Sequence, residues 1–219
     1  MIEVKKMAEL LRCPDGEMAG EITDFMARAN RKIYDFVYSK MELSKGLNVL
    51  ELGMANGAFV NDLFILEPYL RYTGIDYSLQ MVEHSILQNQ MSIADKQITF
   101  LQGNISELPI ESNSIDLFFT VNTHYFWEDF EKCKNEIIRV LKNGGQFIIG
   151  GRTKESLLKF EFSNFGFNLY STQDFISQFE SELLSTLEYA SEVENIQFPD
   201  GSYGEIEDIC FFGRKKLYY

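Results

Sequence analysis

Residues 47–66 constrain the fold of this chain more than any other segment. They begin with an apolar run, residues 47–52, which stops at Gly53, and small residues continue as far as Gly57. An amphipathic stretch follows, starting at Phe59. An apolar run, a small-residue turn and a helical period in this order predict a buried strand that leads through a tight turn into a helix.

The turn in this segment is suited to binding a ligand. Gly53 and Gly57 carry no Cβ, so a ligand can approach the backbone N–H groups closely. The N-terminus of the following helix adds N–H groups that have no partner inside the helix. Glu51 stands two residues before Gly53. A phosphate site avoids a negative charge there, whereas a cationic or zwitterionic ligand is favoured by one.

Strands and helices alternate along most of the chain. Apolar runs predict strands at residues 47–52, 71–76, 98–102, 115–121 and 146–150, with helices between them. Such alternation indicates a parallel sheet covered on both faces. Two later strands, residues 188–198 and 209–214, are joined by the turn 199–201 and are expected to pair antiparallel.

The helices carry recognisable start and stop signals. Ser78 and Asp129 are expected to be N-caps, and Gly144 is expected to end the second of these helices in a left-handed conformation. Thr172 is expected to cap a later helix. One amphipathic helix is predicted before the first strand, with its apolar face running from Ile22 to Val37.

Composition limits the function classes. The 219 residues suffice for one domain with room for a lid, since domains hold about 100–200 residues. A formal charge of −13 argues against a nucleic-acid backbone or an anionic membrane as the main partner. The chain has no apolar run of transmembrane length, and its three cysteines (Cys13, Cys133, Cys210) are expected to be reduced thiols in a cytoplasmic protein.

The expected carboxyl ends of the strands carry a set of polar residues. The second strand ends in Asp76, the third runs into Gly103, Asn104 and Ile105, and the fourth is followed by Asn122. Open parallel sheets bind ligands at this edge, where the strand order reverses. A carboxylate at the end of the second strand suits a pair of hydrogen bonds from vicinal ribose hydroxyls.

Five motifs occur in an order that resembles the class I S-adenosylmethionine-dependent methyltransferases. They are Glu51-Leu-Gly53-Met-Ala55-Asn-Gly57, Gly74-Ile-Asp76-Tyr-Ser78-Leu-Gln-Met81, Gln102-Gly103-Asn104 with Leu108-Pro109, Ser114-Ile-Asp116-Leu, and Arg139-Val-Leu-Lys142-Asn-Gly144-Gly145. The resemblance covers roughly residues 45–150. It implies a doubly wound, three-layer Rossmann-like sandwich whose seven-stranded sheet is mostly parallel, with an antiparallel C-terminal strand.

The resemblance also implies roles at the methionine end of the cofactor S-adenosyl-L-methionine. Gly53, Ala55 and Gly57 would line the methionine moiety, and Glu51 would orient it through water or the turn backbone. Asn122 would lie near the methionine end and the acceptor. Ala55 replaces the usual middle glycine, which costs little provided that its φ is negative.

At the adenosine end, the resemblance assigns the ribose hydroxyls to Asp76. Tyr77 and Met81 would pack on the adenosine. Asn104 would reach the adenine amino group and the backbone N–H of Ile105 a ring nitrogen. Asn104 replaces the usual aspartate, but its side-chain carbonyl still accepts a hydrogen bond, so weaker binding is expected.

His124 is the candidate catalytic base, since it follows the fourth strand where an acceptor should approach. The alternative is a hydrogen-bonded histidine in a loop packed by aromatic residues. Residues 1–44 are expected to form a helical lid on the methyltransferase domain of residues 45–219, and the phenylalanine-rich residues 152–170 a substrate-side insertion.

The predicted function is methyl transfer to a small-molecule acceptor by a monomer or homodimer, without metal, nucleic acid or membrane. Two alternatives remain open. Gly53-x-Ala55-x-x-Ala58 loosely matches a dinucleotide fingerprint, which would make the protein a nicotinamide-dependent oxidoreductase. A non-catalytic binding protein would keep the same fold.

Overall fold

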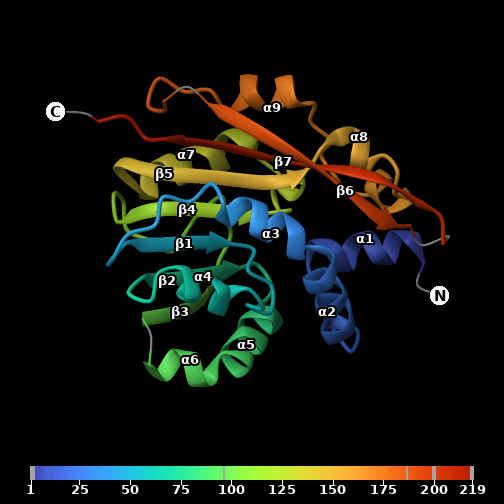
Figure 1. The fold of residues 1–219 in the computed structure, drawn as a ribbon, viewed down its shortest axis with the longest axis horizontal. Helices are drawn as coiled ribbons and strands as arrows, with labels where there is room; N and C mark the ends of the chain where they lie inside the picture. The colour runs from blue at the N-terminus through green and yellow to red at the C-terminus, as the bar shows by residue number, and fades with distance from the viewer. Residues whose placement is uncertain (1–2, 96, 186, 199–200, 218–219) are drawn as a thin grey trace.

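The computed structural model describes residues 3–95, 97–185, 187–198 and 201–217, which form a three-layer α/β sandwich (Figure 1). The seven strands of its sheet are ordered β3-β2-β1-β4-β5-β7-β6. Their bounds are β1 Asn48–Leu52, β2 Arg71–Asp76, β3 Gln97–Gln102, β4 Ile115–Val121, β5 Leu141–Arg152, β6 Glu188–Gln197 and β7 Tyr203–Arg214.

The sheet confirms the predicted fold class. The pairs from β3 to β5 are parallel, whereas β7 pairs antiparallel with both β5 and β6. The strand order reverses between β1 and β4, which places a switch point at their carboxyl ends. Residues 199 and 200 of the predicted turn between β6 and β7 lie outside the described residues.

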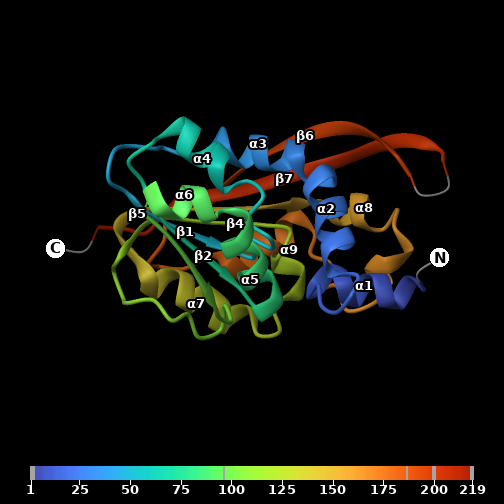
Figure 2. The ribbon, with the colours of Figure 1, turned by 90° about the horizontal axis from the view of Figure 1, so that it is seen from below.

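Helices cover both faces of the sheet, as Figure 2 shows for α3 and α4 on one side and α7 on the other. The helices are α1 Val4–Arg12, α2 Ala19–Ala29, α3 Arg31–Tyr38, α4 Val60–Leu66, α5 Leu79–Gln88, α6 Gln90–Asp95, η1 His124–Phe126, α7 Phe130–Val140, α8 Lys154–Leu157, η2 Glu161–Asn164 and α9 Thr172–Phe179. Alternate strand residues enter separate cores: Val49 and Phe119 pack with α3 and α4, and Leu50 and Phe118 with α7 and α9.

Most of the predicted helix signals are confirmed. The side chains of Ser78 and Asp129 accept hydrogen bonds from the first turns of α5 and α7. Ser171, one residue before the predicted Thr172, is the N-cap of α9. The prediction for Gly144 was wrong in position: its φ is +80°, but α7 ends at Val140 and β5 has already begun.

The single helix predicted from Ile22 to Val37 was wrong, because the chain forms α2 and α3 with a break at Asn30. Asn30 has φ −99° and ψ 2°, and its side chain accepts a hydrogen bond from Asn122. α3 packs into the core through Ile33 and Val37, which are 1% and 0% exposed. α2, in contrast, lies beyond the carboxyl ends of the central strands (Figure 1).

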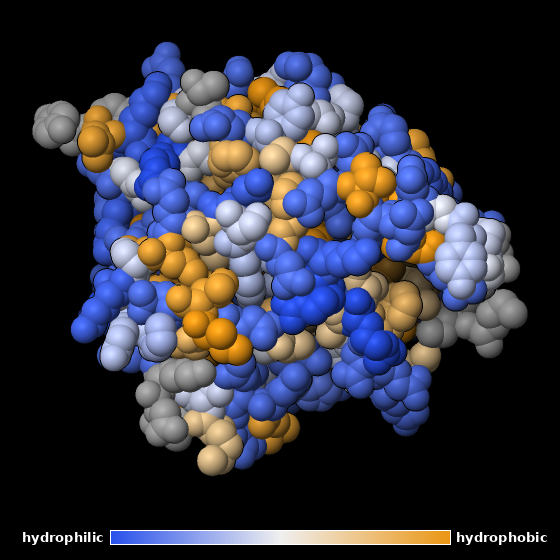
Figure 3. Space-filling view, in the orientation of Figure 1, coloured by the Kyte–Doolittle hydropathy of each residue, from blue (hydrophilic) through white to orange (hydrophobic). Residues whose placement is uncertain are grey.

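The surface fits the acidic composition. The face in Figure 3 is mostly hydrophilic, with separate hydrophobic groups. None of the helices in the described ranges has the length and apolar character needed to span a bilayer. All three cysteines are free, and Cys133 and Cys210 are buried.

Candidate active site

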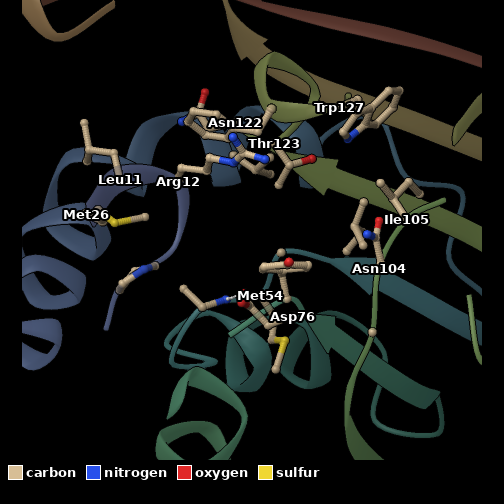
Figure 4. A pocket seen from close by; sticks show the side chains of 18 of the residues that line it. Leu11, Arg12, Met26, Met54, Asp76, Asn104, Ile105, Asn122, Thr123 and Trp127 are labelled. Atoms are coloured by element: carbon tan, nitrogen blue, oxygen red, sulfur yellow. Dashed lines mark hydrogen bonds between the residues drawn. The ribbon is translucent and has the colours of Figure 1, made fainter. Parts of the chain in front are cut away.

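A cavity of about 400 Å³ lies at the carboxyl ends of β1, β2 and β4 (Figure 4). Met54 lines it after β1, Asp76 at the end of β2, Asn104 after β3 and Asn122 after β4. The side opposite these strand ends is formed by α1 and α2, from which Met26 projects. The structure thus brings together most of the predicted binding residues at the predicted edge of the sheet.

The turn after β1 has a left-handed backbone at three alternate positions. Gly53, Ala55 and Gly57 have φ values of +75°, +50° and +68°. A Cβ on Gly53 would lie 2.3 Å from Cγ2 of Thr123, so this position admits no side chain. The negative φ under which Ala55 would cost little is not found, and a left-handed alanine costs about 1–2 kcal/mol. Gly53 and Ala55 line the cavity, whereas Gly57 packs behind it.

Asp76 presents a carboxylate to the cavity. Its Oδ2 accepts the N–H of Ala55 at 3.0 Å and its Oδ1 accepts the N–H of Ser78 at 2.9 Å. Burial raises the pKa of Asp76 to about 6, although these N–H groups lower it. The group is therefore ionised at neutral pH. Because each carboxylate oxygen accepts more than one hydrogen bond, both can also accept from a diol.

The far end of the cavity is flat and partly apolar. Gly103, Asn104 and Ile105 line it, and Figure 4 shows Trp127 beside Ile105. Oδ1 of Asn104 accepts the N–H of Ser106 at 3.0 Å. Trp127 is 3% exposed, and its Nε1 is a buried donor without a partner in the described part of the chain.

Of the two side chains predicted to pack on the adenosine, Tyr77 lines the cavity and Met81 does not. Tyr77 lines the cavity and is 63% exposed, so its ring is available to a ligand. Met81 is fully buried in α5 and does not line the cavity. Its predicted contact with adenosine therefore finds no support in the structure.

Glu51 lies beneath the cavity rather than in it. The carboxylate is 1% exposed and accepts hydrogen bonds from the hydroxyls of Tyr34, at 2.7 Å, and Tyr72. Burial raises the pKa of Glu51 to about 7, and the two tyrosines lower it. The hydrogen bonds of Glu51 thus come from tyrosines, and its expected role in orienting the methionine moiety stays a prediction.

Asn122 connects the cavity to the helix break. It has φ +56° and lines the cavity. Its Nδ2 donates to Oδ1 of Asn30 at 3.1 Å, and its Oδ1 accepts from the hydroxyl of Tyr125 at 3.0 Å. Asparagine tolerates this left-handed conformation better than most residues, which explains its use directly after β4.

The prediction of His124 as catalytic base finds no support in the structure. His124 is 4% exposed and does not line the cavity. Its ring packs against Tyr125 and Phe175, with ring centroids 4.0 and 5.3 Å apart, and Nδ1 has no partner in the described residues. Burial lowers the pKa of His124 to about 3, so the imidazole stays neutral. The alternative of a structural loop histidine fits this environment.

Sequence reasoning expected a lid in residues 1–44 but did not single out the residues of this segment that line the cavity. Arg12 lines the cavity and forms an ion pair of 2.5 Å with Glu128. The carbonyl of Pro14, another lining residue, accepts a hydrogen bond of 2.9 Å from Ser78. Tyr34 also lines the cavity. These residues are far from the strand ends in sequence, and no local pattern marks them.

The insertion 152–170 does not line the cavity. Phe167 packs against Tyr125 and Phe126, with ring centroids 5.8 and 4.6 Å apart. Phe126 and Trp127 do line the cavity. The expected substrate-side insertion therefore contacts the loop after β4 and reaches the cavity only through it.

The cavity and its carboxylate occur within a region that matches a known family. Residues 50–149 match the family model described as a methyltransferase domain. The chain therefore contains a methyltransferase domain. A curated relative of this methyltransferase, the uncharacterized methyltransferase YdaC of Bacillus subtilis, is 25% identical over 60% of the chain and 70% of its own length.

Two further proteins, each with a named activity of its own, are similar to the chain. The demethylmenaquinone methyltransferase of Lactococcus lactis is 34% identical over 47% of the chain but only 41% of its own length. A solved phosphoethanolamine N-methyltransferase of Haemonchus contortus, in complex with S-adenosylhomocysteine, has a TM-score of 0.72. The structural match spans 99% of the present chain and 61% of the length of the Haemonchus protein. At 14% identity, this match shows the fold alone.

Proposed function

We propose that the methyltransferase binds S-adenosylmethionine across this cavity and methylates a small-molecule acceptor that enters beside it. The adenine would lie at Asn104, Ile105 and Trp127, the ribose hydroxyls at Asp76, and the methionine at residues 53–55. The observation that carries the proposal is the Asp76 carboxylate, held open to the cavity by N–H groups of Ala55 and Ser78.

The residues fit this cofactor. Gly103, Asn104 and Ile105 line the proposed adenine end, and the carboxylate of Asp76 supplies acceptors at the ribose. When bound, S-adenosylmethionine supplies an electrophilic methyl group. The protein then has to align the acceptor and exclude water, and proximity of this kind is worth about 7–11 kcal/mol. His124 lies outside the cavity, so no proton transfer is assigned to it.

The acceptor is proposed to be small and partly apolar. Leu11, Met26 and Phe126 line the cavity away from the residues assigned to adenosine. The charge of −13 supports a protein that binds neither nucleic acid nor an anionic membrane. A cytoplasmic monomer or homodimer is part of the same proposal, in line with three free cysteines.

We further propose that the lid is formed by residues 12–29, and that α3 is fixed. Two contacts hold the segment before α2. Arg12 forms an ion pair with Glu128, and the backbone N–H of Gly16 donates a hydrogen bond of 2.9 Å to Oε1 of Gln80. Exposed ion pairs contribute about 0–1 kcal/mol, so the first contact opens easily. The insertion 152–170 would shape the acceptor side indirectly.

Isothermal titration calorimetry tests the function. S-adenosylhomocysteine should bind the wild-type protein, and NAD should not. Asp76→Asn should weaken binding at least tenfold, because a charge-assisted hydrogen bond contributes about 1.5–3 kcal/mol. Glu83→Gln, an exposed charge removal on α5, is the matched control and should bind as wild type.

Two outcomes would redirect the proposal. Binding of NAD without S-adenosylhomocysteine would favour the oxidoreductase. Binding of S-adenosylhomocysteine with no methyl transfer to any acceptor in a broad panel would favour a non-catalytic protein.

A further inference from the structure

One buried carboxylate near the cavity lacks a cation. Glu51 accepts hydrogen bonds from two phenols, Tyr34 and Tyr72, and forms no ion pair in the described part of the chain. A carboxylate removed from water is costly unless a positive charge or several donors compensate it. The ionised form of Glu51 therefore lacks a positive charge that would compensate its burial.

Only one of the two phenols connects Glu51 to the cavity. Tyr34 lines the cavity, and its ring stacks on Phe59 with centroids 3.8 Å apart. Tyr72 is 1% exposed and does not line the cavity. Tyr34 projects from α3, one turn after Asn30, and so stands at the end of the cavity where β1 and β4 emerge.

We propose that Tyr34 is the positioning residue through which Glu51 recognises the α-ammonium group of the cofactor, so that binding of the methionine end is linked to loss of a proton from Glu51. This inference rests on the proposed function. A phenol that donates to a carboxylate becomes a better acceptor for a cation, because hydrogen bonds in a chain polarise one another. Asn122 lies at the same end of the cavity.

The direction of the pH effect follows from the ionisation of Glu51. The titratable groups that face it are Tyr34 and Tyr38 from α3 and Tyr72 and Asp76 from β2. With its pKa at about 7, Glu51 is mostly protonated at pH 6 and mostly ionised at pH 8. An ammonium group favours the ionised form. Affinity for the methionine end should therefore rise about tenfold from pH 6 to pH 8.

The experiment compares two ligands that share the adenosine. S-adenosylhomocysteine carries the amino and carboxyl groups, and 5′-methylthioadenosine lacks both. Their Kd values are measured by calorimetry between pH 6 and pH 8. Asp76, whose pKa is about 6, faces the ribose that both ligands have, so its titration cancels in the ratio of the two affinities.

Matched variants separate the relay from simple packing. Tyr34→Phe keeps the ring on Phe59 and should weaken S-adenosylhomocysteine about tenfold at pH 8, leave 5′-methylthioadenosine within about twofold, and make the ratio independent of pH. Tyr72→Phe removes the other donor to Glu51. It should keep the pH-dependent ratio, with its midpoint at a higher pH.

The wild-type protein alone keeps the inference testable where a variant fails to fold. At pH 7, S-adenosylhomocysteine should release roughly half a proton more than 5′-methylthioadenosine, measured in buffers of different ionisation enthalpy. A pH-independent ratio in the wild type, or a pH-dependent ratio in Tyr34→Phe, overturns the inference and leaves the proposed function standing. Failure of the wild type to bind either ligand overturns both.

Discussion

Ala55 holds a backbone conformation that few alanines adopt. Its φ is +50°, between two glycines that are also left-handed. In this conformation its N–H donates to Asp76 and its carbonyl accepts from Oγ of Ser85 at 2.8 Å. Residues held in sparsely populated conformations cost about 1–3 kcal/mol and persist where the surroundings fix them. The strain here accompanies the alignment of the proposed ribose-binding carboxylate.

Ala55→Gly should therefore stabilise the protein by about 0.5–1 kcal/mol, because relief of the left-handed strain exceeds the added freedom of the unfolded chain. Urea unfolding measures the change. Gly57→Ala is the matched opposite: its φ is +68° and its Cβ would lie 2.9 Å from Nδ2 of Asn89, so it should destabilise. A less stable Ala55→Gly would contradict the strain.

His124 contributes packing rather than chemistry. His124→Ala should lower the free energy of unfolding by about 2–4 kcal/mol, because it opens a cavity between Tyr125 and Phe175. Affinity for S-adenosylhomocysteine should stay within about twofold, since the ring is outside the cavity. Urea unfolding measures the change in stability, and calorimetry on the same preparation measures the affinity for S-adenosylhomocysteine. His84→Ala, a partly exposed change on α5, serves as control.

At the scale of elements, the strands were predictable and the N-terminal helices were not. β2 and β4 have the predicted bounds, and in β4 the reason is a nearly continuous apolar signal, which is typical of strands buried on both faces. The helical period of residues 22–37 continues across Asn30, so the pattern does not reveal the break. That break depends on Asn122, 92 residues away.

The site divides in the same way. Asp76, Asn104 and Asn122 were predictable because strand ends converge at one edge of a parallel sheet. Arg12 and Tyr34 were not, because they reach the cavity through the packing of α1 and α3. Long-range contacts of this kind leave no local period in the sequence.

The different packing of α2 and α3 predicts different dynamics. Hydrogen exchange should show residues 33–38 protected with and without S-adenosylhomocysteine, since Ile33 and Val37 lie in the core. Residues 12–29 should gain protection when the ligand binds, because they line the cavity and Phe25 is 50% exposed. Equal protection of residues 12–29 in both states would contradict the proposed lid.

At the scale of the whole molecule, negative charge opposes folding at high pH. The formal charge is −13, and among the residues that the structure describes three carboxyl groups are also buried. Burial raises the pKa values of Glu51 and Asp208 to about 7 and that of Asp76 to about 6. Asp208 lies 3.8 Å from Nε of Arg152 and is 4% exposed, so the arginine only partly compensates its burial.

The ligand-free protein should thus be more stable at pH 6 than at pH 8. The folded state holds these protons more tightly than the unfolded chain, whose carboxyl pKa values are about 4, so stability falls as pH rises through 7. Glu51 and Asp208 should each contribute about 1 kcal/mol to the difference and Asp76 less, giving about 2–3 kcal/mol in all. Urea unfolding at both pH values measures it, and Asp208→Asn should remove about a third to a half of the difference. Equal stability at the two pH values, or greater stability at pH 8, would show that these carboxylates are compensated in the folded protein, because self-repulsion of the net charge acts in the same direction as their burial.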